Sequence, residues 1–287
     1  MATLQAILNG LLVGGIYALI AMGMALVFGV MRLVNFAHGS FLMVGMYLAF
    51  FGYTLLRINP YWGFVLVGGA LFLIGFGIYW LFIRRVMGQS DFLQILLTEG
   101  ISLCLVGGAQ LLFTGDYRSI SLPLADRTAN AGALNFNVAY AVSFAIALLG
   151  ATCMYLYMRY TEMGRAIRAV AQNQGVAPLM GIRVGWVSGI SFAFGVACAG
   201  AAGALLLPVF YVNPTVGGPY NLKSFVIVVL GGMGSLEGAA LGGLLLGVTE
   251  GLTAYYWEDS YTQVVDFVVF LAVLLLRPQG LFGKKAP

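Results

Sequence analysis

The chain has very few charged residues for its length. Only 8% of its 287 residues are Asp, Glu, Lys or Arg, whereas 61% are hydrophobic. Soluble domains carry about a quarter charged residues, because their surfaces must be wetted. This shortage of charge excludes a soluble domain and predicts a membrane protein. The net charge of +4 then reflects Lys and Arg in loops between spans, and not a nucleic-acid-binding surface.

Residues that bind metals or carry out catalysis are also scarce. Cys104, Cys153 and Cys198 lie in apolar runs without a CxxC pair, and His38 is the sole histidine. We therefore expect neither a metal site nor a disulfide. GxxxxGK[ST], GxSxG and HExxH motifs are missing, and the Gly280-Leu-Phe-Gly-Lys-Lys285 segment lacks P-loop spacing. We expect no catalytic residues, no cofactor in this chain and no enzymatic activity.

Long apolar runs fill most of the chain. A helix needs about 20 residues to cross the hydrocarbon layer. The runs predict spans at residues 4–30, 39–56, 61–83, 93–113, 137–158, 186–207 and 236–254, with shorter segments at 222–233 and 262–276. Segment 222–233 is about half a bilayer long, so it is interpreted as broken, tilted or re-entrant. The predicted fold is an all-α polytopic transmembrane bundle of eight or nine spans, with residues 1–287 forming one integral domain.

The distribution of Lys and Arg predicts the orientation. With the N-terminus outside and nine alternating spans, ten basic residues lie on the inner side: Arg32, Arg84, Arg85, Arg159, Arg165, Arg168, Arg183, Arg277, Lys284 and Lys285. Four lie on the outer side: Arg57, Arg118, Arg127 and Lys223. This positive-inside bias predicts a cytoplasmic C-terminus. The start of the chain has no basic region, so we expect no cleavable signal peptide.

The largest predicted cytoplasmic feature is the loop 159–185. Its first part favours a helix on which Arg165 and Arg168 share one face. Gly175 predicts a break, and Pro178 suits the first turn of a second short helix. Such a unit, held by a span at each end, is suited to docking on a cytoplasmic partner and transmitting motion into the membrane. The spacing equally allows a loop that only sets the topology.

Acidic residues in the spans are the next candidates for function, because burying a carboxylate in a membrane is costly. Glu99 lies about a third of the way into its predicted span. It either faces a solute path and attracts an ammonium group, or pairs with a polar neighbour as a structural lock. Glu237, Glu250 and Asp266 are expected near the interfaces, within reach of water.

Seven residues are candidates for a translocation path. They are polar or glycine residues at predicted helix ends and turns, together with Glu99: Asn9, Asn35, His38, Glu99, Gly231, Gly232 and Gly234. Glycines also recur every four residues from Gly234 to Gly242 and from Gly243 to Gly251. This spacing is typical of close helix packing, and a helix beside a path needs the same geometry.

Four blocks of sequence, in order along nearly the whole chain, carry a family resemblance. They are Asn9–Gly23 with Asn35-Phe-Ala-His-Gly39, Met163–Ala169 with Gly181, Leu230–Ala239 with Gly242–Gly247, and Arg277–Gly283. In these blocks the chain resembles the Liv-type branched-chain amino acid permeases of bacteria, and in particular the shorter of the two permease types. Glu99, in Leu97-Thr-Glu-Gly100, lies outside the family pattern.

The resemblance implies a permease subunit of an ATP-binding-cassette importer in the bacterial inner membrane. The implied solutes are branched-chain or related amino acids; relatives also import urea, short amides and aromatic acids. The implied partners are a homologous second permease forming a heterodimer, two cytoplasmic ATPases that hold ATP and Mg, a periplasmic binding protein and membrane lipid. It assigns coupling to Glu162, Gly164, Arg165, Arg168, Gly175, Pro178 and Gly181.

Two other classes remain as alternatives to the importer. An ion-coupled secondary transporter needs intramembrane acids beside broken helices, for which Glu99 and segment 222–233 are the support. A passive channel for small solutes needs no docking loop, so the loop 159–185 argues against it.

Overall fold

Helix α1 (Ala2–Met31) is the central helix of the computed structural model, which describes residues 2–124, 127–131, 134–277 and 279–282. It packs against α6, α8, α9 and α10, so lipid is kept from most of its surface.

The other elements are α2 (His38–Leu56), α3 (Pro60–Ile78), π-helix η1 (Tyr79–Ile83), α4 (Arg84–Val86), α5 (Asp91–Phe113), α6 (Val138–Tyr160), α7 (Glu162–Gln172), 3₁₀-helix η2 (Ala177–Met180), α8 (Val184–Leu206), α9 (Gly217–Gly231), α10 (Leu236–Tyr256), η3 (Asp259–Tyr261) and α11 (Thr262–Leu276).

The helices confirm a polytopic helical membrane protein. Within the described residues, six helical segments are long and apolar enough to cross a membrane: α1, α2, α3 continued through α4, α5, α6 and α8. The bent pair of α9 and α10 raises the number to seven if it counts as one span, and α11 is shorter. Each predicted span corresponds to a helix with nearly the same bounds, because continuous apolar runs can satisfy their backbone in lipid only as helices.

The prediction of a broken or re-entrant segment at 222–233 corresponds to α9. This helix starts earlier than predicted, at Gly217, and meets α10 at an angle of 119°. Gly232 (φ +103°) and Gly234 (φ +84°) form the bend in a backbone conformation that side chains disfavour. The bend turns the chain back into the bundle.

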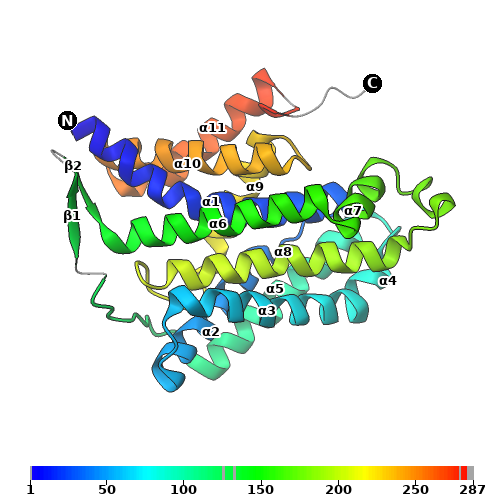
Figure 1. The fold of residues 1–287 in the computed structure, drawn as a ribbon, viewed down its shortest axis with the longest axis horizontal. Helices are drawn as coiled ribbons and strands as arrows, with labels where there is room; N and C mark the ends of the chain where they lie inside the picture. Colours follow the sequence, from blue (N-terminus) through cyan, green and yellow to red (C-terminus); the bar gives the residue numbers. More distant parts are fainter. Residues whose placement is uncertain (1, 125–126, 132–133, 278, 283–287) are drawn as a thin grey trace.

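The all-α prediction is wrong in the loop between α5 and α6. Strands β1 (Thr128–Ala131) and β2 (Leu134–Asn137) pair antiparallel there, with Thr128 opposite Asn137. These residues lie between the apolar runs that predict spans 93–113 and 137–158, and strands of four residues are too short to give a clear alternating pattern. Figure 1 shows the hairpin at the same end of the bundle as the N-terminus, with α7 at the opposite end.

Glycines bring α1 and α10 into backbone contact. A Cβ on Gly247 would lie 2.5 Å from the Cα of Gly14, and one on Gly14 would lie 3.0 Å from the carbonyl oxygen of Gly243. Gly10 faces Gly247 in the same way. The four-residue spacing therefore serves close packing, as small residues do between membrane helices.

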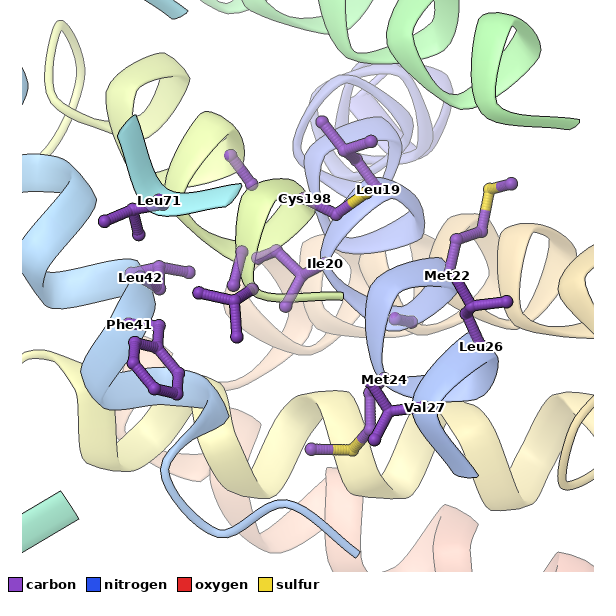
Figure 2. Close-up of a cluster of buried hydrophobic side chains, with 14 of the residues drawn as sticks. Leu19, Ile20, Met22, Met24, Leu26, Val27, Phe41, Leu42, Leu71 and Cys198 are labelled. Carbon is purple, nitrogen blue, oxygen red and sulfur yellow. The ribbon is translucent and has the colours of Figure 1, made fainter. Parts of the chain in front are cut away.

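The apolar core surrounds the second half of α1. Ile20 of α1, Leu42 of α2, Leu71 of α3 and Cys198 of α8 meet in one buried cluster (Figure 2). All four are at most 8% exposed. These helices are consequently fixed relative to one another, and they form the frame against which α9, α10 and α11 are placed.

Candidate functional site

A cavity of about 520 Å³ lies at the end of the bundle that carries the β-hairpin. Its walls come from α1, α6, α9 and α10, and β2 contributes to its rim. The lining residues are Asn9, Gly10, Val13, Tyr17, Thr128, Asn135, Phe136, Asn137, Tyr140, Phe210, Tyr220, Lys223, Gly247, Glu250, Gly251, Ala254 and Thr262. Its volume falls within the range of about 300–1,000 Å³ found for small-molecule sites.

An ion pair forms one wall of this cavity. The Lys223 Nζ on α9 lies 2.6 Å from the Glu250 Oε1 on α10, and their side chains are only 19% and 12% exposed. The Tyr17 hydroxyl donates to the Glu250 Oε2 at 2.8 Å and accepts from the Lys223 ammonium at 3.1 Å. The Lys223 ammonium also lies 5.0 Å from the Tyr17 ring centroid, over the electron-rich face of the ring. Three helices therefore hold two opposite charges at fixed positions.

A second carboxyl group lies in a neighbouring cavity that Lys223 also lines. Asp266 on α11 is 3% exposed, and neither of its carboxylate oxygens accepts a hydrogen bond from a described residue. It lines a smaller cavity of about 140 Å³ between α9 and α11, and Lys223 lines that cavity as well. Lys223 and Thr262 line both cavities, and each cavity also contains one carboxyl group, that of Glu250 or of Asp266.

The sequence analysis placed Lys223 on the outer side and Glu250 and Asp266 near the interfaces, without a partner for any of them. In the structure all three side chains are mostly buried between helices, and Lys223 and Glu250 pair with each other. Each was judged singly by its distance from the end of an apolar run. A buried charge is stable only when an opposite charge lies beside it, and here the opposite charges lie on different helices. A basic residue and two acids in three successive apolar segments were the signal that could have found them.

Of the predicted path residues, only Asn9 lines this cavity. Its carboxamide oxygen accepts from the Gln5 Nε2 at 3.1 Å, and Gln5 also bonds the backbone of Asn135. The N-terminus of α1 is thereby attached to β2 at the cavity rim.

Asn35 lies in the non-helical segment that leads from α1 back into the bundle, and His38 is the first residue of α2, which follows this segment. The His38 Nε2 bonds the carbonyl of Ile20 at 3.0 Å, although Ile20 precedes Met31 by about 16 Å along α1. Both polar residues are fully buried, and the Asn35 Nδ2 and the His38 Nδ1 have no described partner. The segment starts α2 at mid-bundle, where Gly39 touches Gly217 at the start of α9.

Glu99 lies on the exposed side of α5 and lines neither cavity. The residue before it faces inward: Thr98 is fully buried and accepts from the Phe36 backbone N–H at 3.3 Å. One turn later, Ser102 bonds Ser40 of α2 at 2.8 Å. Glu99 is therefore directed away from the helices of its own chain.

Gly231, Gly232 and Gly234 lie in the bend between α9 and α10. Gly231 packs directly on Gly238, and Gly234 lies against Gly29 near the end of α1. The segment after α11 covers this bend, because the Leu281 N–H donates to the Leu230 carbonyl at 2.8 Å. Lys284 and Lys285 lie outside the described residues.

The loop 159–185 has the predicted helix–break–helix structure. It comprises α7, a break at residues 173–176 and η2 with proline in its first turn. Asn173, which the sequence reasoning missed, organises the break: its side-chain oxygen accepts from the N–H groups of Gly175 at 2.9 Å and Val176 at 3.1 Å. Gly181 closes η2 with φ +78°.

Contacts at both ends of this loop tie it to the membrane helices. Gly164 packs against the carbonyl of Met158 at the end of α6, and Arg168 donates to that same carbonyl. The Gln174 Nε2 donates to the Val30 carbonyl of α1 at 2.5 Å. Among the described residues, the ion-pair partner of Arg165 is the exposed Glu162, at 3.6 Å. Arg168 therefore fixes α7 on α6, whereas Arg165 faces outward.

Comparison with known proteins shows the family of the chain. Residues 6–274 match the model of the branched-chain amino acid transport system permease component family. The chain belongs to this family. It is 34% identical to the high-affinity branched-chain amino acid permease protein LivH of Salmonella typhimurium, with 98% of this chain and 96% of the relative covered. It is 33% identical to BraD of Pseudomonas aeruginosa over the same shares, and 29% identical to a probable LivH of Methanocaldococcus jannaschii over 97% and 92%. No solved structure matches significantly.

In this permease, blocks that are far apart in the sequence meet in space. The first block, on α1, packs through Gly10 on Gly247 of the third. The last block contacts the third, where Gly280 lies against Gly232. The resemblance therefore follows one continuous interface of α1, α9 and α10, whereas the second block forms the start of α7 on the end of α6.

Proposed function

We propose that this chain is a membrane-embedded subunit of an ATP-driven importer that takes up branched-chain amino acids across a bacterial inner membrane. The family and the named relatives support the solute class. In this proposal a periplasmic binding protein delivers the solute, and two cytoplasmic ATPases hold ATP and Mg. The chain itself, residues 1–287 as one domain, supplies the path and the coupling loop.

The attachment of α7 and η2 is the observation that carries this proposal. The pair projects from the bundle, yet Arg168 fixes it to α6 and Gln174 fixes it to α1. A push on such a unit reaches both the peripheral helix and the central one. A secondary transporter or channel has no use for a rigid lever of this kind, so the loop argues for an external ATPase.

The structure also supports the proposed orientation. Gln174 of the loop and Gly234 of the α9–α10 bend both lie against the C-terminal end of α1, whereas Gln5 and the β-hairpin lie at its N-terminal end. If the loop is cytoplasmic, the N-terminus is outside and residues 279–282 lie near the inner side. We propose eight or nine crossings on this basis, counting α9 to α11 individually.

Glu99 supports the presence of a second permease subunit. It lies eight residues, about 12 Å, into an apolar helix whose surface is mostly exposed in this chain. A carboxylate at that depth is costly against lipid chains. We propose that the homologous permease covers α5 and supplies a polar partner to Glu99.

Reconstituted uptake tests the proposed function. The chain is co-purified with two partner ATPases and a second permease subunit, placed in proteoliposomes and supplied with the binding protein and labelled leucine. We expect uptake that requires ATP on the ATPase side and that an ion gradient cannot replace. Uptake by the isolated chain under a proton or sodium gradient would overturn the proposal.

The loop break should control coupling. Replacing Asn173 by alanine removes the acceptor of two backbone N–H groups, each hydrogen bond contributing about 1 kcal/mol. A loss of about 1 kcal/mol lowers the population of the ordered break about fivefold. We therefore expect the leucine imported per ATP hydrolysed to fall severalfold. Asn173→Asp keeps the accepting oxygen and should retain coupling. Equal transport stoichiometry in Asn173→Ala and wild type would remove the break from the mechanism.

A further inference from the structure

The cavity beside α9 and α10 carries two opposite charges and an apolar wall. Lys223 and Glu250 present an ammonium and a carboxylate, and Tyr17 bonds both of them. Val13, Phe136 and Phe210 line the same cavity. A fixed cation, a fixed anion and an apolar surface are the three features that complement an amino acid with an apolar side chain.

We propose that this cavity binds the zwitterionic head group of the transported amino acid. Lys223 receives its α-carboxylate, Glu250 receives its α-ammonium, and the apolar wall receives its side chain. This inference rests on the proposed function and names the residues that recognise the solute.

In the structure Lys223 and Glu250 are paired with each other, which explains why both are stable when the cavity holds no solute. A zwitterion inserted between them replaces one close pair with two and adds no net charge. A molecule with only one of the two groups would leave either Lys223 or Glu250 without a partner. The cavity should therefore select amino acids over simple amines and carboxylates, because these would leave a buried charge unpaired.

Binding of labelled leucine to the whole complex in lipid nanodiscs, without ATP or binding protein, tests this site. The competitors are 4-methylpentanoate, 3-methylbutylamine and 4-methylpentanamide, which keep the carbon chain but carry only a carboxylate, only an ammonium or no charge. We expect each to compete at least tenfold less well than leucine. No leucine binding, or equal competition by any one of them, overturns the zwitterion site.

The matched variants separate recognition from folding. The double variant Lys223→Met with Glu250→Gln removes both charges together and leaves neither unpaired. We expect it to assemble normally and to bind leucine at least tenfold more weakly, no better than the neutral amide. Glu237→Gln is the control, because Glu237 is exposed at the other end of α10 and bonds Tyr155.

If the double variant binds leucine within threefold of wild type, the pair is structural and the inference is wrong. ATP-driven uptake by the wild-type complex is measured on the same preparation. If the complex takes up leucine but lacks the predicted binding pattern, only the proposed site is wrong. If the complex takes up no leucine, the proposed function is wrong.

Discussion

Gly247→Val is expected to prevent the chain from folding stably. A Cβ at Gly247 would lie 2.5 Å from the Gly14 Cα and 2.6 Å from the Gly14 backbone nitrogen. Both obstacles are backbone atoms of the central helix, so no side chain can move aside. Overpacking of well-packed sites costs about 1–3 kcal/mol, and we expect at least the upper value, because α1 and α10 must separate along their length.

Gly69→Val is the matched control for this experiment. Gly69 lies in a membrane helix too, α3, but no described atom lies within 4 Å of a Cβ there. Thermal unfolding in detergent, with size-exclusion profiles of the extracted protein, should show a large loss for Gly247→Val and little change for Gly69→Val. If the two variants unfold alike, the backbone contact of α1 and α10 does not determine stability.

Lys223→Met is expected to be the most destabilising single substitution of a charged residue. It keeps the length of the side chain but leaves Glu250 without its cation. Removing one partner of a buried ion pair costs about 3–5 kcal/mol, because an uncompensated charge remains. The measurement is the free energy of unfolding, or the thermal midpoint, of the extracted protein.

Combining Lys223→Met with Glu250→Gln should recover most of this loss. The double variant has no unpaired charge in the large cavity, and neutral replacements of a buried pair are often close to neutral in stability. Non-additivity of this sign is the signature of direct coupling between the residues. Additive losses would show that Lys223 and Glu250 do not interact in the folded protein.

The sequence predicted the helices well and the bend adequately. Apolar runs are local properties, and lipid leaves a helix as their main solution, so α1 and α11 follow directly from composition. The loop 159–185 was also predictable, because Gly175 and Pro178 act on their own neighbourhood. Asn173 was missed there, although an asparagine before a turn is a known organiser of loop backbone.

Short blocks of residues also predicted the family, and relatives that cover nearly the full length confirm it. The sequence did not predict the β-hairpin, because strands of four residues show almost no periodic pattern of apolar residues. Glu99 illustrates the limit of depth as a criterion: it lies well inside an apolar run, yet the fold turns it away from its own bundle.

The sequence by itself determined that this is a helical membrane protein with long apolar helices, and its four motif blocks indicated the permease family that the relatives confirm. Only the tertiary structure decided where charge is held inside it. Lys223 and Glu250 lie on two different helices, and each charge is stable there because the other neutralises it. Apolar runs are determined by nearby residues, whereas the energy of a buried charge depends on atoms far along the chain.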